Sequence, residues 1–332
     1  MSRVRCGDAA IALLVVAAAA ACSSPAPDKS AFSRRERAPY LDTDTMGLVP
    51  QGTLQIRVQA RPILVENSGA AISHTQPGVF FTINDSGNEP ILFALDTTGA
   101  DRGVWRVNGA TNRDWEAVSV GPCLPGKAEA CVYIGDVGDN EGERPSRVIY
   151  RVAEPRARQA GFTGDVVASS LRYRYADGPH DVEAMYVAPT GDTYLITKRR
   201  LRNAAGAMRP SLVFVLPATA WQTGDAVAEL VDSLSIIPGS APLRTITDAA
   251  LSPDSRYLAV RTYAQVYVFA TDSTTGRVNG SIPPTICNTA ALLRWASEGI
   301  TWFGQSSRLL LTNEGNDSPM FAIDCPMPRG GE

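Results

Sequence analysis

The chain has 332 residues, with 31 Lys and Arg against 34 Asp and Glu, and its formal net charge is −3 at pH 7. No long basic run occurs, so the composition argues against a nucleic-acid partner. The only histidines are His74 and His180, and no Cys-x-x-Cys is present, so a zinc site is poorly supported.

The N-terminus has the pattern of an export signal. Arg3 and Arg5 precede an uninterrupted apolar run over residues 9–21, which is too short for a stable membrane-spanning helix. Small residues leading to Cys22 resemble the bacterial lipobox, although Ala19 stands where that motif usually carries Leu. The resemblance implies that residues 1–21 are a lipoprotein signal peptide and that Cys22 is acylated, for example with palmitate. The alternative is an ordinary signal peptide, which would also export the chain.

A Pro- and Ser-rich segment follows the signal peptide. Residues 22–47 have no apolar periodicity, which predicts a flexible tether between membrane and domain. Loss of Arg3, Arg5 and Asp8 changes the formal charge from −3 to −4. Membrane attachment is therefore expected only through the lipid at Cys22, in the bacterial cell envelope. The residue after that cysteine is Ser23 rather than Asp, which permits the outer membrane.

The cysteine count also indicates export. Cys6 leaves with the signal peptide and Cys22 takes the lipid, which leaves four. An even number in an oxidising compartment predicts two disulfides, with three possible pairings. We favour one bond that closes a short local loop and one that ties the tail to the last segment, namely Cys123–Cys131 and Cys287–Cys325.

Strand-like runs dominate the predicted domain over residues 48–327, and residues 328–332 are expected to be a disordered tail. The runs are rich in Val, Ile, Leu, Tyr and Phe and are separated by Gly, Asn, Asp and Pro, which predicts an all-β fold. No dozen-residue segment holds a clean helical stripe; 218–231 is the nearest and is assigned as a loop or edge strand. The runs cover residues 54–58, 79–83, 91–95, 132–134, 148–152, 194–197, 212–216, 257–260, 266–269, 309–312 and 320–323.

An internal repeat defines the architecture. Each copy has a polar start, an apolar strand, a second strand that ends in polar residues, and a third strand. Acids near the copy starts are 67, 65 and 50 residues apart, a spacing typical of propeller blades. We predict a single β-propeller of five or six blades, with 54–58 as the outer strand that closes the ring; chance similarity within a β-sandwich is the alternative. The five copies begin at Ser68, Asp114, Asp181, Thr247 and Ser297.

A cluster of acids is predicted at one mouth of the central channel. The innermost strands of a propeller line its channel, so residues that flank them converge. The first copy has Ala70 at the matching place, so the ring of acids is incomplete. Oxygen-rich convergence suits a divalent cation, with Ca²⁺ the first choice. The proposed metal ligands are Glu116, Glu183, Asp248 and Glu298, completed by Asp85 and Asp136, and the proposed ligand-binding residues are Lys198, Arg261, Asn140 and Glu314.

Less specific interpretations stay open for these residues. The acids could cap turns, or could form salt bridges with Lys198, Arg261 and Arg144. His180 could act as a general base at the mouth, but a turn histidine after a Gly-Pro pair is the favoured interpretation. The large aromatic residues Trp115 and Trp302 are expected to pack between blades rather than to stack on a ligand.

Several segments resemble a group of exported bacterial β-propeller lipoproteins of unassigned activity. The chain is more distantly similar to phytase-like, gluconolactonase-like and NHL-type propellers, in which acids at the channel mouth can hold a divalent metal and the enzymes hydrolyse esters or lactones. No complete catalytic set of those enzymes is matched, so the resemblance implies fold more than activity. The segments are Asn84-Asp-Ser-Gly-Asn, Asp114-Trp-Glu-Ala, Gly135-Asp-Val-Gly-Asp-Asn with Arg144, and Ile149-Tyr-Arg-Val-Ala-Glu-Pro.

Three functional hypotheses follow. The first is an envelope-anchored propeller, expected to be monomeric, that binds a small molecule or a protein partner at its acidic mouth. The second is a metal-dependent hydrolase of a phosphoester, ester or lactone, in which the cation polarises substrate or water while Lys198 and Arg261 steady a developing anion. The third is a purely structural envelope factor.

Overall fold

The computed structural model describes most of the chain after residue 50. The ranges are 50, 52–58, 63–198, 210–234, 236, 243, 245–293, 296–304, 307–315 and 318–329. The predicted signal peptide, Cys22 and the tether lie outside these residues. Within the described ranges the protein is all-β, and no helix there is long and apolar enough to cross a membrane.

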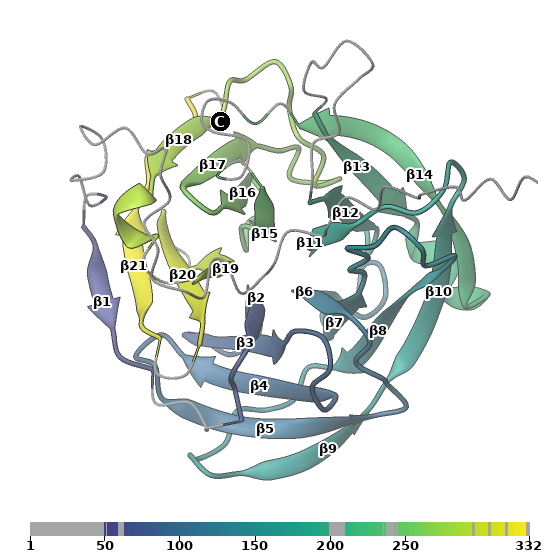
Figure 1. Cartoon of the computed structure of the whole chain (residues 1–332), viewed down its shortest axis with the longest axis horizontal. Coiled ribbons are helices and arrows are strands. Elements are labelled where there is room, and N and C mark those ends of the chain that lie inside the picture. The colour runs from purple at the N-terminus through teal and green to yellow at the C-terminus, as the bar shows by residue number, and fades with distance from the viewer. Residues whose placement is uncertain are drawn as a thin grey trace, which may run out of the picture.

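Antiparallel sheets arranged around one axis make up the domain (Figure 1). Five strands stand closest to that axis, and each is the first strand of a sequence repeat. Every one of them contacts the next, and the last contacts the first, so that they form a closed ring. These inner strands are β2 (Asn67–Ile72), β6 (Trp115–Pro122), β11 (Val182–Val187), β15 (Ile246–Leu251) and β19 (Ala296–Trp302).

Each inner strand begins a four-stranded blade that runs outward from the axis. The second strands are β3 (Val79–Asn84), β7 (Ala130–Asp136), β12 (Thr193–Thr197), β16 (Tyr257–Thr262) and β20 (Arg308–Glu314). The third strands are β4 (Ile91–Asp96), β8 (Arg147–Ala153), β13 (Ser211–Leu216), β17 (Gln265–Ala270) and β21 (Met320–Asp324). The fourth strands are β5 (Asp101–Asn108), β10 (Ser169–Tyr175), β14 (Asp225–Leu234), β18 (Thr285–Asn288) and β1 (Leu54–Ile56). The described residues thus form five blades, within the predicted range of five or six.

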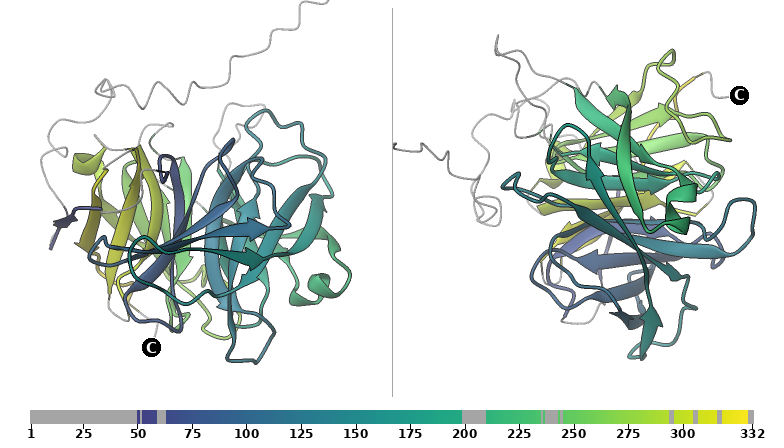
Figure 2. Two further views of the ribbon diagram at one scale, coloured as in Figure 1. Left: turned by 90° about the horizontal axis from the view of Figure 1, so that it is seen from below. Right: turned by 90° about the vertical axis from the view of Figure 1, so that its right-hand side faces the viewer.

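The 67-residue spacing between Glu116 and Glu183 has a simple explanation. After β8 the chain crosses to blade 1, where β9 (Thr163–Val167) pairs in parallel with β5, and then returns as β10 in blade 2. Strands β10 and β14 also pair in parallel, which joins blades 2 and 3 into one eight-stranded sheet. The extra length therefore supplies an outer strand and a crossover (Figure 2).

Apolar side chains from facing blades form the core. A cluster between blades 1 and 2 contains Trp115, and one that joins blades 4, 5 and 1 contains Trp302. Both indoles are buried, and the Nε1 of Trp302 donates to the carbonyl of Ala250 in the neighbouring blade at 3.0 Å. The predicted packing role of the two tryptophans is confirmed. Because a blade cannot cover both of its own faces, this burial favours a closed ring.

The two ends of the domain meet in blade 5. Strand β1 pairs antiparallel with β21, so the prediction that residues 54–58 supply the closing outer strand is confirmed. The disulfides Cys123–Cys131 and Cys287–Cys325 both form as predicted. The second bond joins β18 of blade 4 to the segment after β21.

Two short 3-10 helices complete the described elements, η1 (Ala218–Gln222) and η3 (Ala290–Leu292). The structure of residues 218–231 differs from the sequence interpretation of this segment as a loop or edge strand. That segment contains η1 and most of β14, and β14 lies between β13 and β10 rather than at an edge. Strand β14 was not recognised in the sequence because one of its faces is exposed to solvent and carries polar residues.

Candidate functional site

A β-bulge stands at the start of every inner strand. The pairing of each inner strand with its second strand shifts register there, in all five blades. In β6, β11 and β19 the residues inside the shift include Glu116, Glu183 and Glu298. Since a bulge re-aims a side chain, these three strands present a glutamate at the same end of the channel.

The two remaining bulges carry no acid. In β2 the shift spans Gly69 and Ala70, and Gly69 has a φ of +73°, a conformation that suits glycine. In β15 the shift spans Thr247. Asp248, the next residue, pairs with Arg261 of β16. The ring of acids is therefore incomplete in blade 1, as the sequence predicts, and is altered in blade 4.

Lys198 forms the main ion pair at this end of the channel. It lies directly after β12, and its Nζ bonds to the Oε1 of Glu183 and lies 3.5 Å from the Oδ1 of Asn140. Burial by itself would lower the Lys198 pKa, but the carboxylates of Glu183, Glu116 and Asp181 outweigh burial and raise it well above its usual value. Lys198 therefore stays charged.

Glu298 lies among several other carboxyl groups of the site. Burial raises its pKa well above the usual range, and Glu183, Glu314 and Asp85 raise it further, while Lys198 opposes them. Residues from blades 1, 3 and 5 thus act on a single carboxyl group.

Tyr263 was not predicted as a site residue, yet it lies among these acids. It occupies the short turn between β16 and β17, and its pKa is raised by burial and then by Glu298, Glu183 and Glu116. Lys198 acts in the opposite direction. The phenol therefore remains protonated and can donate or accept a hydrogen bond at the mouth of the channel.

Three carboxylates come together between blades 1 and 2. Asp85, Asp114 and Glu116 each place an oxygen atom within 4.8 Å of the others. Gly138 closes one side, because a Cβ there would lie 2.5 Å from the Oδ2 of Asp114 and 2.8 Å from the Cγ of Glu116. The Oγ of Ser68 also approaches, at 3.3 Å from the Oε2 of Glu116. This oxygen-rich set could hold a hard divalent cation.

Asp114 was not predicted as a candidate metal ligand, although the sequence contained a signal for it. The Asp-x-Glu pattern at Asp114 and Glu116 recurs at Asp181 and Glu183, with the first acid two residues before the bulge. We call the end of the channel formed by six acidic residues the acidic mouth. They are Asp85, Asp114, Glu116, Glu183, Glu298 and Glu314.

Asp136 belongs to a separate buried pair. The Nη2 of Arg144 lies 2.6 Å from its Oδ1, and both side chains are buried. Next to it, Arg147 pairs with Asp139, whose backbone N–H donates to Asp181 at 2.9 Å. These contacts hold the loop after β7 in place, which agrees with the salt-bridge interpretation of the sequence.

Asp248 and Arg261 lie deeper than the acidic mouth. Asp248 accepts backbone hydrogen bonds from Ala70 at 3.0 Å and from Ala249 and Ile300 at 2.8 Å, and burial raises its pKa well above the usual value. It thereby joins blades 1, 4 and 5.

Arg261 is fully buried and reaches into blade 5. Its guanidinium donates to the carbonyl of Gly299 at 2.6 Å, to the carbonyl of Thr312, and to the Oδ1 of Asn313 at 3.0 Å. Burial lowers the pKa of Arg261 to about 10. Its hydrogen bonds are directed into the protein, so we place neither Arg261 nor Asp248 in the proposed site.

His180 is held by its own surroundings. Its Nε2 lies 3.0 Å from the Oδ1 of Asp177, and its ring packs against Tyr175 and Phe214. These contacts agree with the turn-histidine interpretation.

The channel narrows away from the acidic mouth. Residues of all five inner strands line a cavity of about 20 Å³ near the axis, including Ala70, Val118, Val187, Ala250 and Thr301. A volume of this size holds about one water molecule. A ligand larger than an ion is therefore expected to bind over the mouth rather than pass through.

These observations define the class of protein as a β-propeller with an acidic channel mouth. No family model matches the chain, and no curated protein matches it. Solved structures that resemble it include the PQQ-bound aldose sugar dehydrogenase of Streptomyces coelicolor, with 10% identity, a TM-score of 0.37, and coverage of 83% of this chain and 99% of that chain. A luciferin-regenerating enzyme has the same identity and TM-score, with 83% and 80% coverage. The Swd1 β-propeller domain of Myceliophteria thermophila has 11% identity and a TM-score of 0.37, with 77% and 82% coverage.

Proposed function

We propose that this β-propeller binds a cationic ligand at its acidic mouth, either a small molecule or a positively charged group of a protein partner. The observation that supports this most strongly is the convergence of Glu116, Glu183 and Glu298 from three bulged inner strands. Asp85, in the turn after β3 of blade 1, and Asp114, in the loop that leads from blade 1 to blade 2, add two carboxylates.

The charge balance at the mouth favours a cation. Among the described residues, six carboxyl groups gather there, and Lys198 bonds to one of them, Glu183. Bunched carboxylates repel one another, and the raised pKa of Glu298 is one result of burial and that repulsion. A bound cation would reduce the repulsion between these carboxylates and would itself be attracted by them.

A divalent cation, with Ca²⁺ the first choice, is the simplest ligand for part of this surface. Asp85, Asp114 and Glu116 would supply carboxylate oxygens, which hard cations prefer. The cation could in turn bridge the protein to a phosphate, a carboxylate or a sugar hydroxyl of a larger ligand.

Calorimetric titration of the full exported chain with Ca²⁺, in mild detergent, tests this proposal. We expect saturable binding that is lost in Glu116→Gln and kept in Glu89→Gln, where Glu89 is exposed and pairs with Arg106 at 2.7 Å. Equal binding by the two variants would place the cation elsewhere. If the metal does not bind wild-type protein, titration with arginine amide tests the mouth for organic cations, and no binding of either would refute the proposal.

The three clustered carboxylates also favour a second candidate function, a metal-dependent hydrolase of a phosphoester, ester or lactone. The geometry favours it less, because Lys198 bonds to Glu183 and Arg261 is fully buried. The two basic side chains that the sequence suggested for steadying a developing anion are thus already engaged. Ca²⁺-dependent turnover of a p-nitrophenyl ester or phosphate, abolished by Glu116→Gln, would support the hydrolase.

We further propose that the domain is displayed on the bacterial envelope by a lipid at Cys22. The two disulfides indicate an oxidising, exported environment. Cys22→Ser should abolish incorporation of labelled palmitate and move the protein out of the membrane fraction. Unchanged labelling and fractionation would refute the anchor without affecting the proposed ligand site.

A further inference from the structure

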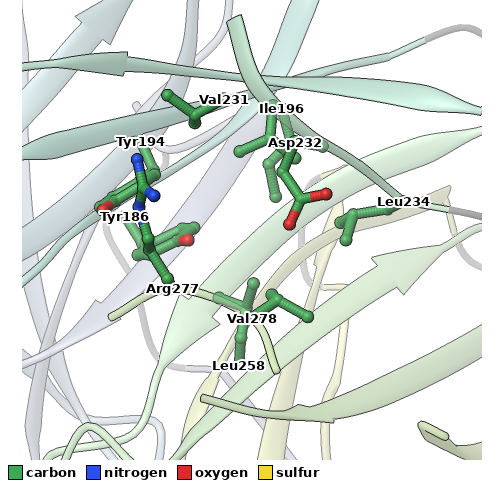
Figure 3. A pocket seen from close by; sticks show the side chains of 10 residues that line it. Tyr186, Tyr194, Ile196, Val231, Asp232, Leu234, Leu258, Arg277 and Val278 are labelled. Carbon is green, nitrogen blue, oxygen red and sulfur yellow. The ribbon is translucent and has the colours of Figure 1, made fainter. Parts of the chain in front are cut away.

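A second pocket lies between blades 3 and 4, away from the channel axis (Figure 3). Its volume is about 140 Å³, some seven times that of the cavity near the axis. Residues of β14 line it on one side and residues of the loop after β17 on another. The residues that define it here are Tyr186, Tyr194, Leu234, Leu258, Asp232 and Arg277.

The inner part of this pocket is apolar and aromatic. Leu234 and Leu258 are buried and line the pocket. The rings of Tyr186 and Tyr194 stack with their centroids 4.8 Å apart and an interplanar angle of 6°. Both tyrosine hydroxyls are bonded to the loop after β17, since each donates to a backbone carbonyl there at 3.1 Å. The rings are thereby fixed in position, and the pocket is a defined shape rather than a loose gap.

Two opposite charges stand at the rim. Strand β14 has a register shift directly before Asp232, and Figure 3 shows the Asp232 carboxylate and the Arg277 side chain on different sides of the pocket. A hydrogen bond with the Tyr194 hydroxyl raises the pKa of Arg277, so this guanidinium is charged and anchored. Within the part of the chain that the structure describes, Asp232 and Arg277 form no ion pair with one another.

The loop that carries Arg277 is well ordered by its own hydrogen bonds. The Oδ1 of Asp272 accepts from the backbone N–H groups of Thr274 and Thr275 at 2.9 and 2.8 Å, and Gly276 donates to the Asp272 carbonyl at 2.8 Å. Gly276 also packs against Ala188 of blade 3. The guanidinium is therefore presented from a fixed turn.

We propose that this pocket binds a free α-amino acid with a large apolar side chain. The ligand ammonium would bond to Asp232, its carboxylate to Arg277, and its side chain would enter the apolar interior beside Tyr186. A zwitterion matches the pocket because it brings one charge of each sign on neighbouring atoms. A ligand with only a positive charge would be repelled by Arg277, and a ligand with only a negative charge would be repelled by Asp232.

The pocket volume sets the size of the side chain. An apolar cavity of about 150 Å³ accommodates a benzene molecule. The observed 140 Å³ is therefore enough for the phenyl group of phenylalanine or the isobutyl group of leucine. A larger bicyclic side chain such as that of tryptophan should fit poorly.

The test is calorimetric titration of the full exported chain with L-phenylalanine, L-leucine, N-acetyl-L-phenylalanine and L-phenylalanine amide. We expect the two zwitterions to bind and each capped compound to bind about tenfold more weakly, because each capped compound lacks one of the two charges that Asp232 and Arg277 would contact. Asp232→Asn should weaken phenylalanine binding by a similar factor while leaving the N-acetyl compound unaffected. Arg277→Gln should likewise weaken phenylalanine binding by a similar factor while leaving the binding of phenylalanine amide unaffected.

Further variants separate this pocket from the acidic mouth and from misfolding. Glu116→Gln should leave phenylalanine affinity unchanged. Val278→Phe, at the rim, keeps both charges and fills the cavity, so it should abolish binding while the thermal unfolding midpoint is maintained. The proposal is overturned if neither amino acid binds at concentrations up to about 1 mM, if the capped compounds bind as well as phenylalanine, or if Val278→Phe binds normally.

Discussion

Asp248 offers the sharpest test of how the ring is held closed. Its carboxylate accepts backbone N–H bonds from Ala70 in blade 1 and Ile300 in blade 5, in addition to Ala249 in its own strand. Asp248→Ala would leave the two inter-blade amides buried without an acceptor. A buried unsatisfied donor costs about 1–3 kcal/mol, so the variant should lose about 2–6 kcal/mol of unfolding free energy.

A loss of this size is large against the usual stability of a domain, which is about 5–15 kcal/mol. Urea unfolding followed by tryptophan fluorescence measures it. The slope rises with protein size and should be about 3 kcal/mol/M here, so the midpoint should fall by about 0.7–2 M. Both inter-blade amides bond to the same oxygen, Oδ2, so Asp248→Asn can keep that acceptor and should lose less than Asp248→Ala.

Asp165→Ala is the matched control for this experiment. Asp165 is exposed and accepts one hydrogen bond, from Asn108 at 3.3 Å. Its removal should change the unfolding free energy by less than about 0.5 kcal/mol. If Asp248→Ala unfolded at the same urea concentration as Asp165→Ala, the assignment of Asp248 as a bridge between blades would be refuted.

Three further predictions concern charge and crosslinking. Lys198→Met should cost about 3–5 kcal/mol because it removes the ion pair with the buried Glu183, and the double variant with Glu183→Gln should recover much of that loss in urea unfolding. The pKa of Glu298 is raised in the folded protein, so this residue lowers stability as pH rises from the usual carboxyl pKa toward the raised value. In the presence of a chelator, Glu298→Gln should therefore raise the thermal unfolding midpoint at pH 7 but not at pH 3. Equal shifts at both pH values would contradict this prediction. The Cys287–Cys325 bond spans 38 residues, so replacing both cysteines by alanine should cost about 4 kcal/mol in the chain-entropy description, and an unchanged midpoint would contradict that value.

The inner three strands of each blade were predictable because they are short, apolar and separated by turn residues. The fourth strands were harder to find. Strand β14, for example, alternates exposed and partly buried positions and reads as a polar segment, since an outer strand has one face in water. The parallel pairing of β9 with β5 could not be inferred, because it depends on where the chain returns in space.

The candidate site was predictable to the extent that it repeats. Glu116, Glu183 and Glu298 share a position in the repeat, and the bulges carry them to the same end of the channel. Asp248 has the same pattern in sequence, but its bulge spans the preceding threonine, so the carboxylate is directed to backbone amides. Tyr263 lies in a two-residue turn, where no periodicity marks a side chain that meets acids from other blades.

The pairing of β1 with β21 has a consequence for how the protein is made. Blade 5 is built from both ends of the domain, so it cannot be completed until the chain has been made as far as Asp324. Until then the blades on either side of the gap each keep one apolar face uncovered. Closure of the ring is thus coupled to completion of the chain, and any tension on the segment preceding Leu54 would act first on the short strand that keeps the ring shut.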